Sequence, residues 1–374
     1  MSSAPRRRAV AALVAIFAIL LVLALLLVPL VQSALFDLIL SPFQKKVPAY
    51  ATFEVERQII VSANGGSIIE FTLDIPAMPD LDSTDQKMQT VLNVSYYPDP
   101  TSLTPRYGVD WAVWQHGALS DEQSYLVRIV YEMRVDAVVW DLDRSSSGNL
   151  TDLPESLKSR YLLDEWKIIV SDPSIQNAAG DIVGAEMNVY SILSAINSWI
   201  TGHIKYPSQN GIAEPQTSVQ TLQSGIGDCD DQAILFCALA RASGVPAWLQ
   251  LGAMYDASIH RWIGHGWVQT YVPQREGGGE EVVIDTANRD FMVWRPNRFA
   301  EYTDDGIGEH LHDYYYSFNC AYEPSSYLGG EGPEFDEEYD SITYVESQER
   351  ITIGGLFQLI CQETDEEMAL VKRS

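Results

Sequence analysis

The chain has 374 residues, with 24 Lys and Arg against 51 Asp and Glu, which gives a formal net charge of −27 at pH 7. This charge excludes nucleic-acid binding as the main activity, because a protein needs a basic face to neutralise phosphates. A hydrophobic share of 46% is enough for the packed cores of two domains and excludes disorder of the whole chain. The four cysteines include no Cys-x-x-Cys pair, which disfavours a zinc ribbon.

The first predicted element is a membrane-spanning helix over residues 9–32. Three arginines at residues 6–8 precede an apolar run of 23 residues, 9–31, which would extend about 35 Å as a helix and cross a hydrocarbon core of about 30 Å. The alternative is a signal peptide cleaved near Val31-Gln32-Ser33, although the apolar region of such a peptide is usually about 7–15 residues.

The arginine cluster predicts the topology of the chain. Basic residues favour the cytoplasmic side of a membrane, so residues 1–8 are expected as a cytoplasmic tail and the rest of the chain outside. Residues 33–50 would form a stalk. We therefore expect a single-pass protein of the cell membrane, with the lipid bilayer as a partner through 9–32 and with extracytoplasmic main domains.

Residues 51–145 are predicted to form a β-sandwich-like domain. Apolar and polar residues alternate over 69–75, 92–96 and 127–135, and Asn64-Gly65 is a hairpin signal. This alternation is typical of antiparallel strands with one buried face.

Residues 150–300 show a different pattern. Apolar residues recur at helical spacing over 186–203, and the segment Asp230–Ser243 is apolar nearly all round, as in a central helix. Three strands are expected to follow, at Ala247–Met254, Trp267–Val272 and Glu281–Asp285. The predicted class is therefore α+β.

Residues 301–374 are expected to be a C-terminal extension. It would contain an acidic loop at 334–340 and a late strand near Ile351–Ile360. Cys320 and Cys361 could pair outside the cell, and the sequence leaves this open.

The segment from Gly225 to Asp231 carries the chemistry. A glycine loop delivers Cys229 to the first turn of the buried helix, where unpaired N–H groups stabilise a thiolate. His265, at the start of a predicted strand, is the candidate base, and Asp285, which ends the next strand, would orient the imidazole. These three residues make a Cys-His-Asp triad.

Three aspartates beside the cysteine allow another interpretation. Asp228, Asp230 and Asp231 would oppose a thiolate, and carboxylates can also bind calcium. They lack the alternating spacing of a calcium loop, so charge in the first helical turn is the simpler interpretation.

The order of these motifs resembles the transglutaminase-like superfamily. The resemblance rests on Thr221-Leu-Gln-Ser-Gly-Ile-Gly-Asp-Cys229, on Gly244-Val-Pro-Ala247, on His265-Gly-Trp267 and on Ile284-Asp-Thr286, and it covers about residues 186–290. It implies a papain-like α+β core, in which the cysteine lies on a central helix packed on an antiparallel sheet. Trp248 and Gln269 stand where the family often has Arg and Glu.

The resemblance implies a thiol acyl-transfer enzyme, without a metal or a cofactor, acting on a peptide or amide substrate. We expect hydrolysis, with two alternatives: cross-linking of glutamine to an amine, or a non-catalytic membrane-tethered scaffold on the same fold. The backbone N–H of Cys229 is the default oxyanion donor, and Tyr206 and Gln223 are further candidates. Trp267 is a candidate substrate contact, although packing is the commoner role of such a residue.

Overall fold

The computed structural model describes residues 45–83, 86–207, 214–327 and 332–353. Within these ranges no helix is both long and apolar enough to cross a membrane. The predicted tail 1–8, the spanning helix 9–32 and most of the stalk 33–50 lie outside the described residues. The described end of the stalk is extended: it forms β1 (Lys45–Pro48), which pairs with β18 (Arg350–Ile353), and begins β2. Residues Val47–Ile351 form one compact unit.

The first large sheet has the strand order β17-β2-β8-β5-β4 and all its pairings are antiparallel. Buried and less buried residues alternate along β2 and β8, because successive side chains of a strand point to opposite faces. The strands are β2 (Tyr50–Ser62), β4 (Leu81–Asp82), β5 (Lys87–Tyr97), β8 (Ser124–Asp136) and β17 (Glu334–Glu346).

The second sheet has the order β16-β3-β7-β6 and is also antiparallel. Aromatic pairs connect it to the first sheet: the ring centroids of Tyr96 and Trp114 lie 5.8 Å apart, and those of Phe318 and Phe335 lie 5.3 Å apart. The strands are β3 (Ile68–Pro76), β6 (Ser102–Arg106), β7 (Val109–His116) and β16 (Phe318–Tyr322).

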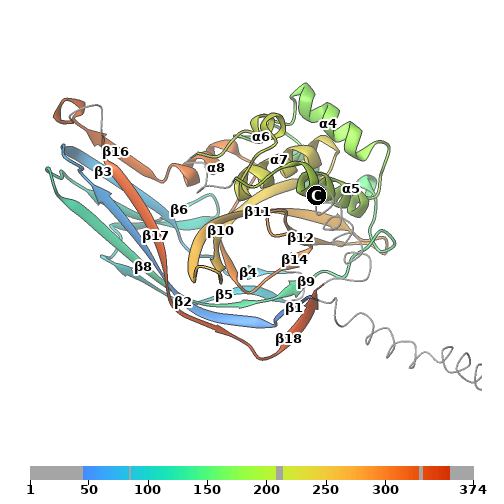
Figure 1. Ribbon diagram of the computed structural model, residues 1–374, viewed down its shortest axis with the longest axis horizontal. Coiled ribbons are helices and arrows are strands. Elements are labelled where there is room, and N and C mark those ends of the chain that lie inside the picture. The colour runs from blue at the N-terminus through green and yellow to red at the C-terminus, as the bar shows by residue number, and fades with distance from the viewer. Residues whose placement is uncertain (1–44, 84–85, 208–213, 328–331, 354–374) are drawn as a thin grey trace, which may run out of the picture. The chain divides into compact units, whose positions relative to one another are not determined.

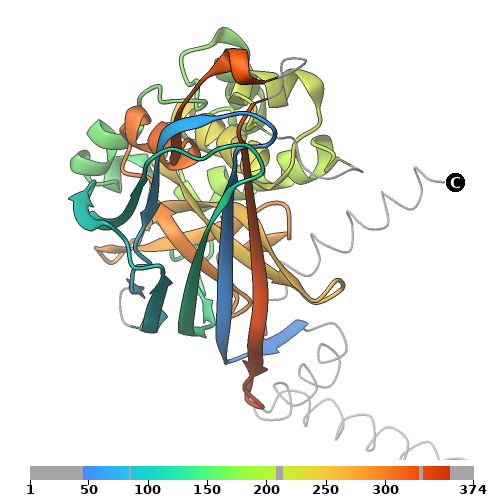
Figure 2. The ribbon, with the colours of Figure 1, turned by 90° about the vertical axis from the view of Figure 1, so that its left-hand side faces the viewer.

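The predicted acidic loop at 334–340 is wrong, because these residues form the first half of β17. Figure 2 shows this strand in red beside β2 in blue, and the register pairs Glu338 with Gln58. Phe335, Glu337 and Tyr339 alternate with fully exposed acidic residues. β17 is an edge strand, where outward charges discourage pairing with another chain. Of the predicted late strand near 351–360, residues 351–353 belong to β18, and the remainder, like Cys361, lies outside the described residues.

The remaining sheet has the order β13-β12-β11-β10-β15, and α7 packs on β10 and β11 with α4, α5 and α6 around it (Figure 1). This confirms the α+β class and the predicted central helix and three strands. The helices are η1 (Leu150–Asp152), α3 (Glu155–Tyr161), α4 (Pro173–Val183), α5 (Val189–His203), α6 (Ser218–Ser224), α7 (Cys229–Ala242), α8 (Gly308–Tyr315) and η2 (Pro324–Ser326). The strands are β10 (Ala247–Asp256), β11 (Arg261–Pro273), β12 (Gly279–Asp285), β13 (Asp290–Phe291) and β15 (Arg298–Thr303), with β14 (Val293–Trp294) paired to β9 (Val138–Val139).

One hydrophobic core joins the strand-rich front of the chain to this sheet. The ring of Phe53 on β2 packs at a tilt of 49° against that of Trp262 on β11, with centroids 4.6 Å apart. Arg57 of β2, only 5% exposed, lies 3.1 Å from the carboxylate of Glu301 on β15. Strands β2 and β8 therefore support the sheet that carries the candidate site. The domain boundary expected between residues 145 and 150 stays a prediction.

Candidate active site

The glycine loop before α7 places Cys229 at the first position of that helix. Lys205 forms a parallel bridge with Ile226, so the chain after α5 runs beside this loop. A Cβ on Gly227 would lie 2.8 Å from the side chains of both Thr221 and Asp231, so only glycine fits there. Cys229 is partly exposed, while the helix behind it is almost wholly buried. The start of α7 can therefore expose the thiol while the rest of the helix stays packed in the core.

His265 connects the thiol to a carboxylate. It lies on β11, is only 6% exposed, and its Nε2 lies 2.8 Å from Oδ2 of Asp285. Burial lowers the pKa of His265, but the negative charges of Asp285 and Cys229, and hydrogen bonds to both, outweigh burial and raise it to about 10. Since Nε2 binds the carboxylate, Nδ1 is the ring nitrogen left for the thiol. The arrangement favours an imidazolium next to the thiol.

Asp285 ends β12 and is held by several donors. Its Oδ2 accepts from Asn288 Nδ2 at 2.8 Å and from Arg298 Nη1 at 2.7 Å, and its Oδ1 accepts the backbone N–H of Asn288 at 3.1 Å. Burial alone would raise the pKa of Asp285, but the charges of His265 and Arg298 dominate and hold it well below its usual range. Asp285 therefore remains a carboxylate and fixes the orientation of the imidazole.

Tyr206 reaches the thiol from the segment after α5. Its hydroxyl shares a hydrogen bond with Cys229, and its pKa is raised by burial first, then by the negative charges of Cys229 and Asp228. A neutral hydroxyl can donate to a developing oxyanion, which is compatible with the predicted role.

The other two candidates lie differently. Gln223 is exposed on α6, and its assignment as an oxyanion donor stays a prediction. Trp267 has no exposed surface, and its indole N–H donates to Gln250 at 2.7 Å. Its ring centroid lies 5.8 Å from that of His265, so full burial favours packing behind the imidazole over the expected substrate contact.

The aspartates at the helix start do not act as three free charges. Asp231 is fully buried and accepts two hydrogen bonds from Gln216, at 2.6 and 2.7 Å. Burial, together with a hydrogen bond to Asp228 and its charge, raises the pKa of Asp230 well above its usual range, although a hydrogen bond from Tyr315 at 2.9 Å acts in the other direction. The raised pKa of Asp230 favours its neutral form, so the repulsion on a thiolate is smaller than the sequence implies.

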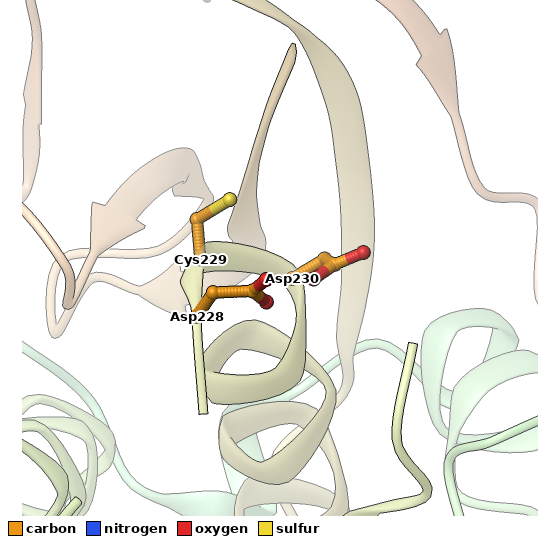
Figure 3. Close-up of side chains that lie close together, drawn as sticks. All are labelled: Asp228, Cys229 and Asp230. Atoms are coloured by element: carbon orange, nitrogen blue, oxygen red, sulfur yellow. The ribbon is translucent and has the colours of Figure 1, made fainter. Parts of the chain in front are cut away.

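Asp228, Cys229 and Asp230 place their ligand atoms within 4.8 Å of one another, a spacing that a metal ion could use. Figure 3 shows these side chains together in the first turn of α7, with the thiol pointing away from the body of the helix. Neighbouring acidic groups are common without an ion, so we assign no metal to them.

Sequence reasoning missed Asn288, Arg298 and Tyr315. Arg298 follows the short stretch Trp294-Arg-Pro-Asn, which carries no periodic pattern or motif. Asn288 lies three residues after Asp285, within the turn that follows β12, and that proximity was the only available signal.

Part of the chain that carries this site matches a known family model. Residues 176–278, which contain Cys229 and His265, match the model of the transglutaminase-like superfamily. Comparison with curated proteins gives no significant match.

Solved structures match this chain at low sequence identity. A protein of Cytophaga hutchinsonii, titled a "Putative Cysteine Protease", superposes with a TM-score of 0.55 at 14% identity and covers 83% of this chain and 96% of its own. The periplasmic domain of TgpA from Pseudomonas aeruginosa gives a TM-score of 0.32 at 14% identity, covering 67% of this chain and 91% of its own. The first of these similarities establishes a common fold.

Proposed function

We propose that the protein is a membrane-anchored, extracytoplasmic cysteine amide hydrolase that acts on peptides or on a cell-surface polymer. The observation that carries this proposal is the position of His265, which binds Asp285 at 2.8 Å and also bonds to the Cys229 thiol. A buried imidazole with a carboxylate on one side and a thiol on the other has the geometry of a nucleophile, its base and an orienting group.

The proposed reaction proceeds through a thioester. The Cys229 thiolate attacks the amide carbonyl carbon, and the negative charge moves to the carbonyl oxygen, near the N–H of Cys229 and the hydroxyl of Tyr206. As the C–N bond breaks, the His265 imidazolium gives its proton to the leaving amine. A water molecule then attacks the thioester, His265 takes a proton from it, and the carboxylic acid leaves as the thiolate returns.

Two alternatives remain with this site. An amine in place of water would give a cross-link, the transamidase reaction. A non-catalytic scaffold on the same fold would not need these three residues to lie together, so their arrangement as a triad argues against it.

The test uses the full chain and a mixture of peptides with and without a primary amine, followed by mass spectrometry. We expect new peptide termini with the wild type and with Cys237→Ala, a matched change of a buried thiol in the same helix, but not with Cys229→Ala. Products enlarged by the amine would favour the transamidase. Alkylation of Cys229 by iodoacetamide no faster than that of Cys237 would exclude catalysis by this thiol.

The membrane part of the proposal rests on residues 6–32 alone. We expect the chain to fractionate with membranes, and external protease on intact cells to degrade the part after residue 33. Recovery of a soluble chain that begins near Ala34 would instead identify a cleaved signal peptide.

A further inference from the structure

A second buried charge group lies directly behind the proposed triad. Arg298 has no exposed surface and bridges two carboxylates: Nη1 lies 2.7 Å from Oδ2 of Asp285, and Nη2 lies 2.9 Å from Oδ2 of Asp290. Arg295 pairs with the other oxygen of Asp290. An arginine buried in this way is fixed in one orientation by its two-sided hydrogen bonding.

The contact to Asp285 falls on the same oxygen that binds His265. Oδ2 accepts His265 Nε2 at 2.8 Å and Arg298 Nη1 at 2.7 Å, so one carboxylate oxygen serves both cations. The negative charge that stabilises the imidazolium is therefore partly neutralised by the guanidinium. The same guanidinium holds the carboxylate in place.

The sheet geometry explains how Arg298 reaches this position. β15 pairs with β10, and Arg298 lies opposite Met254 in this pairing, whose register shifts at Gly252. The other edge of β10 pairs with β11, where His265 lies opposite Gly252. A Cβ on Gly252 would lie 2.0 Å from the carbonyl oxygen of Phe299, so only glycine lets β15 come this close.

We propose that Arg298 is a positioning residue of the site, which fixes Asp285 against His265 and sets the pH range over which the imidazolium persists. This inference rests on the proposed function. It assigns to Arg298 no contact with the substrate, and its effect passes through Asp285.

Other charged groups also bear on the His265–Asp285 pair, and they must stay constant in a test. They come from several elements: Cys229, with Asp228 and Asp230, at the start of α7; Tyr206 after α5; Asp290 on β13; and Arg295 and Arg298 before and at the start of β15.

The test is a titration of His265 by NMR with labelled histidine, in the full chain carrying Cys229→Ala so that no thiolate contributes. In that background Arg298→Gln removes a positive charge next to Asp285, and we expect the pKa of His265 to rise by about one unit, which is tenfold in the protonation equilibrium. Asp290→Asn removes a negative charge that pairs with Arg298, so that the positive charge of Arg298 acts on Asp285 alone. We therefore expect the pKa of His265 to fall by a few tenths of a unit or more.

Shifts of the His265 pKa in opposite directions in these two variants would indicate an effect of charge. A loss of packing would instead shift this pKa in the same direction in both variants. Arg241→Gln is the matched control, because Arg241 is also buried between two carboxylates but at the other end of α7, and it should leave the pKa of His265 unchanged. If Arg298→Gln does not fold, an unchanged or raised pKa of His265 in the near-isosteric Asp290→Asn would still overturn the inference.

An unchanged pKa of His265 in the folded variants, or shifts of the same sign, would overturn the inference. These titrations need no substrate. They therefore fail only if the role of Arg298 is wrong, whereas an unreactive Cys229 in the wild type would count against the proposed function instead.

Discussion

The two ends of helix α7 each hold a pair of carboxylates, but they are neutralised differently. At the C-terminal end, Arg241 Nη1 lies 2.8 Å from Glu165 and Nη2 lies 3.6 Å from Asp304, and all three side chains are almost completely buried. At the N-terminal end no buried cation lies between the carboxyls in the described part of the chain: burial, then a hydrogen bond to Asp228 and its charge, raise the pKa of Asp230, and the hydroxyl of Tyr315 donates to Asp230.

This difference separates a structural end from a chemical one. Each end has one carboxyl with a raised pKa, Asp230 or Asp304, but only the C-terminal end also has a buried, permanently charged cation that holds its partners in place. Cys229 lies at the end without that cation. Substitutions at the two ends should therefore affect different properties: reactivity at the N-terminal end and stability at the C-terminal end.

The largest expected effect is that of His265→Ala on the N-terminal end. Without the imidazolium, the thiolate loses its counter-ion and the leaving amine loses its proton donor, so amide hydrolysis should fall by about 10³-fold or more. Alkylation of Cys229 should require higher pH than in the wild type. Superimposable alkylation profiles of the two proteins would show that His265 does not act on the thiol.

Arg241→Met tests the C-terminal end. Removing the cation leaves the buried carboxylate of Glu165 without its ion pair, and the free energy of unfolding should fall by about 3–5 kcal/mol. Urea denaturation measures this, and the alkylation rate of Cys229 per folded molecule should stay that of the wild type. A variant that keeps full stability but loses thiol reactivity would reverse the assignment of the two ends.

Asp304→Asn should have a smaller effect, which depends on pH. Burial, then the charge of Glu165 and a hydrogen bond to it, raise the pKa of Asp304 well above its usual range. The folded state therefore binds a proton that the unfolded state releases, and this contribution to stability is lost as the pH rises from the unfolded value of about 4 through the folded value.

An asparagine imitates the protonated carboxyl without titrating. Its side-chain oxygen can still accept the N–H of Gly306, which lies 3.0 Å from Oδ1 of Asp304. Urea unfolding at pH 5 and pH 8 should show less loss of stability between the two values for Asp304→Asn than for the wild type, by about 1 kcal/mol. An equal pH dependence in both proteins would mean that Asp304 is ionised in the folded state.

The smallest expected effect is that of Asp230→Asn. Because the raised pKa of Asp230 favours its neutral form, an amide changes little of the charge beside the thiol, and the alkylation profile of Cys229 should move by less than about half a pH unit. A displacement of a full unit toward lower pH would show that Asp230 is a free carboxylate that opposes the thiolate.

The sequence was sufficient to predict the triad, because each of its residues lies in an element with a local pattern of its own. The triad lies on a helix start and at defined places in two strands, and each of those elements has its own apolar pattern. That locality is why Cys229, His265 and Asp285 could be identified together.

The residues behind the triad could not be predicted, because they depend on strand register. Arg298 meets Asp285 only through the pairing of β15 with β10, which includes a shift at Gly252 that no periodicity reveals. The pairing of β17 with β2 depends on residues about 280 positions apart, such as Arg57 and Glu337, and the acidic composition of β17 argued against a strand.

The pairing of β2 with β17 also has a consequence for the order of events during synthesis. At about 5–20 residues per second, the ribosome needs on the order of 15–60 seconds to make the 280 residues that separate the two strands. During that time Arg57 lacks Glu337, and the first sheet has an open edge along β2. Nascent chains that end before residue 334 should therefore be cleaved within β2 by protease, and chains that extend past residue 346 should resist it.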